Sequence, residues 1–485
     1  MVSMADSLAR LGALAQSPIV ARLAEAFDAA GFEFSLVGGP VRDAMLGREV
    51  HDLDFTTNAS PDEILAVIAP LSDAHWDIGR EFGTIGARVS ARDASGATLT
   101  DQVEITTYRA DAYDGVTRKP VVAFGDTLES DLARRDFTVN AMALRLPQMA
   151  LVDPSTGVED LLAGILRTPS TADVSFGDDP LRMLRAARFA AQLGFTPSDD
   201  TVEAMRRRAD SLSIVSIERV QSELTKLLCT DSPRAGIQLL VDTGLADLVL
   251  PEIPALRLEV DEHHHHKDVY EHSLTVLDQA IDYEKQRHPG TPPDLTLRMA
   301  ALLHDIGKPA TKKLESGGTV TFYHHDVVGA KLAKKRLTAL RYDNDTIKNV
   351  SRLIELHLRF FGYSEGAWSD SAVRRYVRDA GPLLERLHML TRADVTTRNR
   401  RKADRLGFAY DDLEQRIAEL REQEEMDAVR PDLDGNRIQE VLGIAPGREV
   451  GEAYRWLLEL RLDNGPLGED EAIRRLRAWW AERSA

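Results

Sequence analysis

Apolar positions in the first third of the chain follow two different periods. Residues 1–30 repeat apolar side chains at helical spacing, from Leu8 and Leu11 to Leu23 and Phe27, which predicts one amphipathic helix. Short alternating apolar segments follow at 34–37, 53–56, 84–89 and 103–108. Segments of this length, separated by glycines or helical stretches, predict strands. Residues 31–150 are therefore interpreted as one α/β domain.

The rest of the chain has helical periodicity almost throughout, beginning at about Asp179. Pro251 and Pro254 interrupt it, and the polar stretch 261–267 follows, so we expect a boundary there. A second helical unit then runs to about residue 400. The remaining residues predict charged amphipathic helices, with breaks at Pro431, Pro446 and Gly465–Pro466.

Composition places the chain among globular proteins. Its 485 residues are 43% hydrophobic and 28% charged, which suggests roughly two to four domains. No apolar run approaches the roughly 20 residues that span a bilayer, and the N-terminus lacks the pattern of a signal peptide. Cys229 is the only cysteine, so no internal disulfide can form. We therefore expect a cytoplasmic protein without a membrane partner.

Charge is strongly negative overall but locally positive. The net charge of −18 argues against a protein that coats nucleic acid nonspecifically. Basic residues nevertheless gather in three segments: 182–208 has six arginines against three acids, 392–405 has six bases against two acids, and 331–341 has five bases and no acid. For any one of these segments, a solvated helix face is the simpler interpretation.

A pair of carboxylates marks the first candidate site. In the alternating stretch 51–55, Asp52 and Asp54 would share one face of a strand, while Leu53 and Phe55 would enter the core. Adjacent carboxylates repel each other, and hard oxygen ligands suit Mg²⁺ with open positions for phosphate. Two ions on such a face could run an in-line nucleotidyl transfer. An Asp-x-Asp pattern alone is more often a loop or a solvated strand edge.

The surroundings of this pair favour a nucleotide site. Gly38 and Gly39 end the preceding strand, and a helix begins at Pro40, which suits a first helical turn. Glycines let backbone N–H groups approach a phosphate at a helix N-terminus, although any tight strand-to-helix turn also needs glycine. Arg42 could add a guanidinium to a triphosphate. Glu104, on another predicted strand, offers a third carboxylate for a metal ion or for activating a hydroxyl.

Several motifs then occur in order between about residues 34 and 230. They are Gly38-Gly39-x-x-Arg42-Asp43, Asp52-x-Asp54, Arg134 to Ala141, Asp178 to Phe189, and Glu218 to Lys226. In this combination the chain resembles the class II tRNA nucleotidyltransferase and bacterial poly(A) polymerase family. The resemblance implies an α+β fold, with a polymerase-β-like nucleotidyltransferase head followed by an all-helical neck, body and tail.

The resemblance also implies a role for each matching residue. It assigns the catalytic magnesium ions to Asp52 and Asp54, the triphosphate to Gly38, Gly39 and Arg42, the ribose and phosphates to Arg135, Asp136 and Asn140, the base to Asp179 and Arg182, and support of the base site to Arg185 and Arg188. Asp178 departs from the family, where glutamate is common, and we assign it no role. The family also has a mobile loop at the turn-rich segment 111–120, which we expect to move when specificity changes from C to A.

Asp179 and Arg182 make chemical sense as a base reader. Three residues apart on a helix, they would be neighbours on one face. Aspartate only accepts hydrogen bonds and arginine only donates them, which matches the amino group and ring nitrogen of cytosine and adenine. Guanine and uracil present a carbonyl instead and leave a buried group unpaired, at about 1–3 kcal/mol. The alternative is a surface salt bridge worth only ~0.3–0.5 kcal/mol.

A second candidate site lies in the later helical unit. His304-Asp305 follows the apolar stretch 299–303, with His272 upstream and Asp394 downstream. This pattern resembles the HD superfamily, whose imidazole and carboxylate ligands suit a divalent metal ion. His324, His325 and His357 could complete a two-metal site. The resemblance suggests an additional phosphohydrolase activity, and the alternative is a scaffold whose histidines are capped or exposed.

Taken together, these sites predict five parts and one main function. The parts are an N-terminal helix at 1–30, the head at 31–165, a base-reading neck at 166–260, the HD domain at 261–400 and a helical tail at 401–485. We expect the protein to add C, C and A to the tRNA 3′ end from CTP and ATP, with no DNA partner. The alternatives are a poly(A) polymerase, which the acid Glu81 in Gly79 to Thr84 mildly disfavours, and an HD phosphohydrolase whose head only binds nucleotide.

Overall fold

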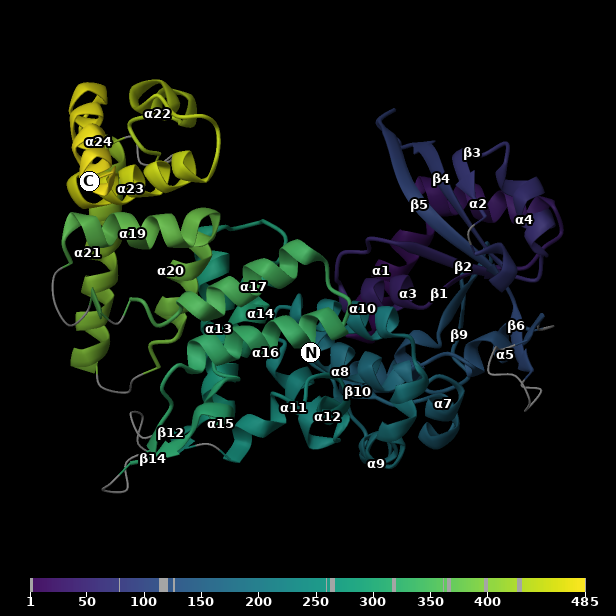
Figure 1. The fold of residues 1–485 in the computed structure, drawn as a ribbon. Coiled ribbons are helices and arrows are strands. Elements are labelled where there is room, and N and C mark those ends of the chain that lie inside the picture. Colours follow the sequence, from purple (N-terminus) through teal and green to yellow (C-terminus); the bar gives the residue numbers. More distant parts are fainter. Residues whose placement is uncertain are drawn as a thin grey trace. The chain divides into compact units, whose positions relative to one another are not determined.

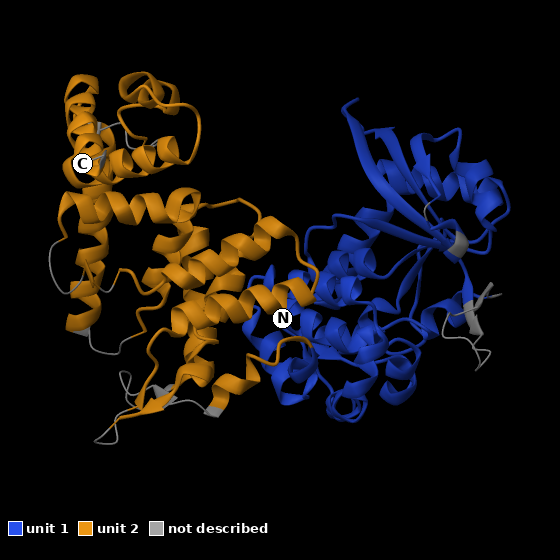
Figure 2. Ribbon diagram, viewed as in Figure 1, with its two compact units in different colours: residues 1–248 blue, residues 249–485 orange. Residues whose placement is uncertain are grey.

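The computed structural model divides the chain into two compact units. It describes residues 3–77, 79–112, 121–124, 127–258, 260–261, 267–315, 320–360, 362–363, 368–396, 400–424 and 430–484. The first unit spans residues 1–248 and the second residues 249–485 (Figure 2). The division falls close to the break predicted at Pro251 and Pro254.

The first unit is built on a seven-stranded sheet in the order β3-β4-β5-β2-β1-β8-β9 (Figure 1). Its strands are β1 (Phe34–Val37), β2 (Leu53–Thr57), β3 (Ser72–Trp76), β4 (Thr84–Arg92), β5 (Thr98–Thr107), β8 (Ala143–Leu146) and β9 (Ala150–Val152). All neighbours are antiparallel except β2 and β5, which run parallel. A separate hairpin pairs β6 (Arg109–Ala112) with β7 (Val121–Phe124). The mixed α and β fold predicted from the sequence is confirmed.

The predicted single helix over residues 1–30 is wrong, because two helices occupy this stretch. They are α1 (Met4–Ala15) and α2 (Pro18–Ala29). Proline fixes its own φ and drives the preceding residue into an extended conformation, as at Ser17 (φ −61°, ψ 146°), so a new helix starts at Pro18. The break lets α1 pack on α3 (Gly39–Leu46), where Arg10 donates to the carbonyls of Ala44 and Met45.

One face of the sheet is closed by an aromatic stack. Phe27 of α2, Phe34 of β1 and Phe55 of β2 are stacked, with ring centroids 4.3 and 4.6 Å apart. Leu53 is buried on the same strand, as the alternation of β2 predicts. Helices α2 and α4 (Pro61–Ile68) both pack on β4 and β5. The even-numbered side chains of β2 therefore point to the opposite face.

Short elements and helices complete the first unit. They are η1 (Arg80–Phe82), α5 (Leu128–Ala133), η2 (Thr138–Asn140), α6 (Gly157–Ala163), β10 (Ile165–Leu166), α7 (Ala172–Asp178), α8 (Leu181–Leu193), β11 (Thr196–Pro197), α9 (Asp199–Arg208), η3 (Ala209–Ile214), α10 (Ile217–Leu228), α11 (Arg234–Asp242) and α12 (Leu245–Val249). Helix α8 lies at the centre of this group, because α10 and α11 both pack on it. Gly236 allows that approach, since a Cβ there would lie 2.4 Å from the carbonyl oxygen of Ala187.

The second unit is helical apart from short strand pairs. Its first part contains η4 (Pro254–Leu258), β12 (Val260–Asp261), β13 (Lys267–Asp268), α13 (Val269–Arg287), α14 (Leu295–Leu303), α15 (Lys308–Thr311), β14 (Lys313–Leu314), β15 (Val320–Thr321), α16 (His325–Ala339), α17 (Asn344–Leu356), α19 (Asp370–Ala380), η6 (Gly381–Leu383) and α20 (Leu384–Ala393). Its last helices are α21 (Arg400–Glu424), α22 (Gly435–Leu442), α23 (Arg448–Asn464) and α24 (Glu469–Ser484). The breaks predicted at Pro431, Pro446 and Gly465–Pro466 are confirmed, since they fall between these helices.

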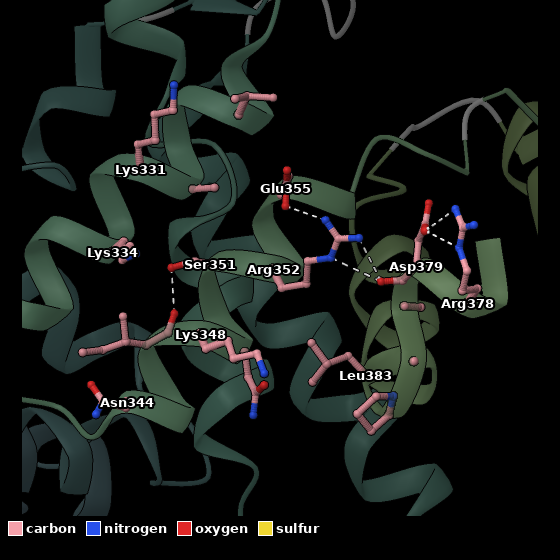
Figure 3. Close-up of a pocket in the computed structure, with 17 residues that line it drawn as sticks. Lys331, Lys334, Asn344, Lys348, Ser351, Arg352, Glu355, Arg378, Asp379 and Leu383 are labelled. Atoms are coloured by element: carbon pink, nitrogen blue, oxygen red, sulfur yellow. Dashed lines mark hydrogen bonds and ion pairs between the residues drawn. The ribbon is translucent and has the colours of Figure 1, made fainter. Parts of the chain in front are cut away.

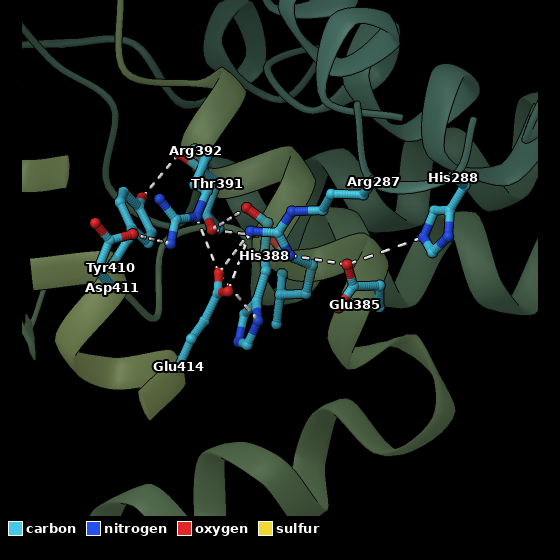
Figure 4. A network of polar contacts seen from close by, with 10 residues as sticks. Arg287, His288, Glu385, His388, Thr391, Arg392, Tyr410, Asp411 and Glu414 are labelled. Carbon is cyan, nitrogen blue, oxygen red and sulfur yellow. Dashed lines mark hydrogen bonds and ion pairs between the residues drawn. The ribbon is translucent and has the colours of Figure 1, made fainter. Parts of the chain in front are cut away.

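One carboxylate ties the long helix α21 to α13 and α20 (Figure 4). Glu414 of α21 accepts hydrogen bonds from Arg287 at 2.8 Å and from Arg392 at 2.9 Å. Burial raises the pKa of Glu414, but these guanidinium groups and His388 outweigh burial and lower it. In the described part of the chain, no helix is long and apolar enough to cross a membrane.

Candidate functional site

The carboxylates of the first site come together on the open face of the sheet. Asp54 of β2 and Glu104 of β5 are direct partners across the parallel strand pair, and exposed Asp52 precedes Leu53. Burial, then the charge of Glu104, raises the pKa of Asp54 to about 6, although Arg135 opposes this. Burial and a neighbouring carboxylate therefore disfavour the charged form of Asp54, and a bound cation would favour it. Three neighbouring carboxylate side chains fit a divalent cation.

A glycine turn lies beside these carboxylates, as the sequence predicts. Gly38 has a φ of +72°, a conformation that other residues rarely adopt, and α3 begins at Gly39. A Cβ at Gly38 would lie 3.0 Å from a guanidinium nitrogen of Arg135. Gly38 thus serves the backbone turn and also lets Arg135 lie against it.

Arg42 is held more firmly than the sequence indicates. It is 5% exposed and donates to both oxygens of Asp43 at 2.8 and 2.7 Å. A third N–H donates to the side-chain oxygen of Asn140 at 2.7 Å. Guanidinium carries five N–H donors. Arg42 therefore links the first turn of α3 to η2. Its remaining guanidinium N–H groups are left for a ligand.

Asp131 is a residue of this site that the sequence analysis missed. Its carboxylate is fully buried and accepts from Arg134 at 2.7 Å and from Arg135 at 3.1 Å. Burial raises the pKa of Asp131, but the two arginine charges outweigh burial and lower it. The i,i+3 and i,i+4 spacing from Asp131 to the two arginines was the available signal.

Asp136 is the best-compensated buried acid of the unit. It accepts from Arg185 at 2.8 Å, from the Asn140 amide at 3.0 Å and from the Phe137 N–H at 2.9 Å. Burial alone would raise the pKa of Asp136, but the charge of Arg185 and these hydrogen bonds lower it to about 2. The arrangement locks the start of α8 to η2.

Phe189 of α8 is surrounded by arginines. The guanidinium carbons of Arg42, Arg185 and Arg188 lie 5.2, 5.4 and 4.1 Å from its ring centroid. Cations at these distances are attracted to the face of an aromatic ring. Arg188 also donates to buried Glu223 of α10 at 2.6 Å. Arg188 therefore fixes α8 to α10.

Asp179 and Arg182 do not share one helix, which corrects the sequence analysis. Asp179 lies between α7 and α8 with φ −143° and ψ 101°, because Pro180 disfavours helical geometry at the residue before it. One oxygen of Asp179 accepts the Leu181 N–H at 3.1 Å, at the start of α8. The other accepts from Arg219 at 2.7 Å, so Asp179 pairs with Arg219 rather than with Arg182.

Arg182 connects the predicted base reader to the carboxylate site. It donates to the Ser175 hydroxyl at 2.8 Å and to the Arg134 carbonyl at 2.6 Å. Both acceptors are neutral, so the guanidinium charge stays available to a ligand. Arg134 shares Asp131 with Arg135, and the charge of Arg135 acts on Asp54. Contacts thus join Arg182 to Arg134, Asp131 and Arg135, and the charge of Arg135 acts on Asp54 of the acidic pair.

The second site gathers the predicted HD residues at the helix ends of the second unit. His272, His304 and Asp394 each offer a ligand atom within 4.8 Å of the others. His272 Nε2 lies 2.9 Å from Asp394 and 3.3 Å from His304 Nε2. Burial lowers the pKa of His304, but Asp305 and Asp394 outweigh burial and raise it to about 10. These carboxylates therefore favour a positive charge at the position of His304.

A second group of ligands adjoins the first. Asp305, His325 and His357 also offer atoms within 4.8 Å of one another, whereas His324 belongs to neither group among the described residues. Nδ1 of His304, His325 and His357 each faces a backbone carbonyl three residues earlier, at 2.9, 2.8 and 2.6 Å. A carbonyl only accepts, so each Nδ1 carries a proton, and Nε2 is the ring nitrogen left to face a metal ion. Nε2 of buried His357 has no hydrogen-bond partner in the described structure, which fits a second metal ion.

One expectation falls on residues outside the described ranges. Most of the turn-rich segment 111–120, where we expect a moving loop, lies outside them, since only residues 111 and 112 are described.

Three family models match the chain in the order of these sites. Residues 34–167 match the poly A polymerase head domain, and residues 194–256 match the probable RNA and SrmB-binding site of polymerase A. Residues 269–399 match the HD domain. The carboxylate site lies in the first match and both metal-ligand groups lie in the third.

Whole-protein comparisons agree with these matches. The A-adding tRNA nucleotidyltransferase of Deinococcus radiodurans is 35% identical over 93% of this chain and 96% of its own length. The CCA-adding enzyme of Geobacillus thermodenitrificans is 38% identical, but over 44% of this chain and only 50% of its own length. The crystal structure of the Bacillus stearothermophilus CCA-adding enzyme in complex with CTP has a TM-score of 0.69 at 24% identity, covering 96% of this chain and 98% of that one, which shows the shared fold.

Proposed function

The chain belongs to the family of tRNA nucleotidyltransferases and bacterial poly(A) polymerases, and on that basis we propose that it adds C, C and A to the 3′ end of tRNA from CTP and ATP. The observation that carries the proposal is the chain of contacts from Arg182 through Arg134 and Asp131 to Arg135, whose charge acts on the carboxylate of Asp54. It links the carboxylates that would hold metal ions to the residue that would read the base. A tRNA substrate also agrees with the cytoplasmic location expected from the sequence.

The carboxylates supply the reaction centre of this proposal. Asp52 and Asp54 would hold Mg²⁺, with Glu104 beside them. When bound, these ions would stabilise the attacking and leaving oxygens of an in-line displacement on the α-phosphate. The 3′-hydroxyl of the RNA forms the new phosphodiester bond, and pyrophosphate leaves. Glu104 would accept the hydroxyl proton, because it borders Asp54 on the neighbouring strand.

The glycine turn and its arginines would bind the triphosphate. The backbone N–H groups at the start of α3 face a ligand at a helix N-terminus. Arg135 lies against Gly38, and Arg42 keeps free donors. The support of Asp136 by Arg185 and Asn140 would hold the ribose-binding region rigid. These residues would position nucleotide without regard to its base.

Base choice would depend on Asp179 and Arg182. Arg182 would donate to the ring nitrogen of cytosine or adenine, and Asp179 would accept the exocyclic amino group. Arg219 already holds one oxygen of Asp179, which fixes the direction of that carboxylate. Uracil and guanine would place a carbonyl oxygen against it. Each such mismatch costs about 1–3 kcal/mol, or roughly ten- to a hundredfold in selection.

Addition of A alone is the second candidate. The D. radiodurans protein, which matches nearly along its whole length, is named an A-adding enzyme, and amino-edge recognition would serve it equally. Two tRNA substrates separate the candidates, one ending at the discriminator base and one ending in CC. Under the main proposal CTP is incorporated into the first and ATP into the second. Incorporation of ATP into the second substrate alone, with no use of CTP on the first, would establish the A-adding candidate.

The HD residues support a further proposal for the second unit. His272, His304 and Asp394 would hold one divalent ion, and Asp305, His325 and His357 would hold another. Such a pair of ions activates water for attack on a phosphate ester. We expect metal-dependent phosphohydrolase activity on terminal or cyclic phosphates. Substituting Asp305 should abolish that hydrolysis, and substituting Asp54 should abolish nucleotide incorporation. Hydrolysis that survives in Asp305→Ala would contradict the assignment.

A further inference from the structure

A basic groove crosses the helices of the second unit, on a different face from its metal-ligand groups. It has a volume of about 740 Å³ and is formed by α16, α17 and the turn from α19 into η6 (Figure 3). Val327, Lys331 and Lys334 form its wall on α16, at helical spacing of four and three residues. His325 lies two residues before Val327, which places it about 200° away around α16. The groove is therefore not an extension of the metal site.

Its charge is opposite to that of the whole protein. Five basic and two acidic residues line the groove, whereas the chain carries a net charge of −18. Both acids are already paired: Arg352 donates to Glu355 at 2.6 Å, and Arg378 lies 3.0 Å from Asp379. Arg352 also donates to the backbone carbonyl of Asp379 at 3.0 Å. The two arginines thus form a fixed frame for the groove.

The remaining charges are three lysines that face solvent. Lys331 and Lys334 of α16 and Lys348 of α17 are exposed, and no acid among the described residues forms an ion pair with them. Three uncompensated cations on adjoining helices attract a ligand with several negative charges. This placement changes the interpretation of segment 331–341, whose bases the sequence alone explains as a solvated helix face.

The floor of the groove narrows the choice of ligand. Half-buried Ala330 lines it between the charged walls, together with the buried side chains of Ile347 and Leu383. A small inorganic anion can contact only part of this surface, because the lysines come from two helices. A sugar-phosphate chain presents successive anionic phosphates joined by apolar ribose faces, so it can contact the lysines of both helices and the surface between them. Phosphate contacts of this kind position an RNA without reading its sequence.

We propose that this groove binds the sugar-phosphate backbone of the substrate RNA. The proposal rests on the proposed function for the identity of the RNA. It lies outside residues 194–256, which match the RNA-binding family model, so it is an additional RNA contact. Lys331, Lys334 and Lys348 contact phosphates, and the apolar floor contacts ribose.

Binding of a tRNA transcript that lacks its CCA end, measured by fluorescence anisotropy on the full chain, tests the groove. The variants are Lys334→Ala, the triple Lys331→Ala/Lys334→Ala/Lys348→Ala, and the control Lys335→Ala. Lys335 is exposed on the same helix and next to Lys334, but it does not line the groove. The triple variant should raise the Kd roughly tenfold or more, and each groove lysine should lower the slope of log K against log salt by about 0.7–0.9. The control should leave that slope unchanged.

The same experiment identifies the source of the phosphates and separates the two proposals. Equal affinity and equal salt slope in Lys334→Ala and Lys335→Ala would overturn the proposal that the groove binds RNA. Tripolyphosphate serves as the competing probe: if its binding depends on these lysines while tRNA binding does not, the ligand is a free polyphosphate and the proposal fails. Failure of the proposed function looks different, because the wild-type chain would then bind tRNA without incorporating CTP or ATP.

Discussion

Removing Arg185 should expose how much the first unit depends on one ion pair. Asp136 has a buried carboxylate, and Arg185 is the guanidinium that pairs with it among the described residues, at 2.6 Å. The pKa of Asp136 falls from 3.8 to about 2, which corresponds to about 2 kcal/mol in favour of the charged form. Taking away one partner of a buried pair costs about 3–5 kcal/mol, because the other charge is left uncompensated. A third of the Arg185 side chain is exposed, which weakens the pair. Arg185→Gln should therefore lower the local stability by about 2–3 kcal/mol, at or below the lower end of that range.

The sign of the pH dependence follows from the direction of the pKa shift. In the wild type the pKa of Asp136 is depressed, so its contribution to stability is present above pH ~4 and is lost as pH falls through about 2. In Arg185→Gln burial is no longer offset by that charge, so the pKa of Asp136 rises from its wild-type value. The loss of stability in the variant, relative to the wild type, is therefore largest at pH values above the raised pKa of Asp136. It becomes smaller as pH falls below that pKa.

Hydrogen exchange of the amides in α8 measures this local stability without requiring the whole chain to unfold in one step. The comparison needs Arg185→Gln, Asp136→Asn and the double variant. Two neutral amides can pair with each other, so the double variant should recover about 2 kcal/mol relative to the sum of the single losses. Strictly additive losses in α8, with no recovery in the double variant, would refute the buried-pair reasoning.

Three further outcomes follow from the described contacts. Gly38→Ala should raise the KM for nucleotide at least tenfold in incorporation kinetics. A side chain at φ +72° strains the turn by roughly 1–2 kcal/mol, and it also crowds Arg135. An unchanged KM would contradict the role of the turn. Glu414→Gln should lower the local stability of α21, measured by hydrogen exchange, by about 2 kcal/mol. The control Glu419→Gln, at an exposed position of the same helix, should leave it almost unchanged. Equal effects of the two substitutions would contradict the role of Glu414 in holding the helices together. Asp305→Ala should lower the metal content of the purified chain measured by mass spectrometry, since Asp305 lies against both ligand groups; full retention of metal would argue against two adjoining sites.

Local chemistry explains what the sequence could predict. The alternation at Leu53, Asp54 and Phe55 specifies which face each side chain takes, because strand geometry has a period of two. The turn at Gly38 is equally local, since only glycine suits its φ. The HD residues were predictable from their resemblance to a known pattern, and His325 and His357 had been named beside them.

Other features depend on contacts between distant segments or on local competition. The pairing of Asp179 with Arg219 joins residues 40 positions apart, which spacing along the chain does not reveal. Pro180 decides the conformation of Asp179, because proline disfavours helical geometry at the residue before it. Pro18 divided the first helix for the same reason. The grouping of the groove lysines depends on the packing of α16 against α17, which the spacing of residues along the chain does not reveal.

The most direct test of the account measures incorporation of each of the four nucleotides into tRNA lacking its CCA end, by the wild type, Asp179→Ala and Asp54→Asn. The account predicts that the wild type uses CTP and ATP and rejects UTP and GTP. Asp54→Asn should lose incorporation of every nucleotide, whereas Asp179→Ala should keep some incorporation but lose discrimination by roughly ten- to a hundredfold. Unchanged discrimination in Asp179→Ala would contradict the claim that this side chain and Arg182 select the base in place of a template.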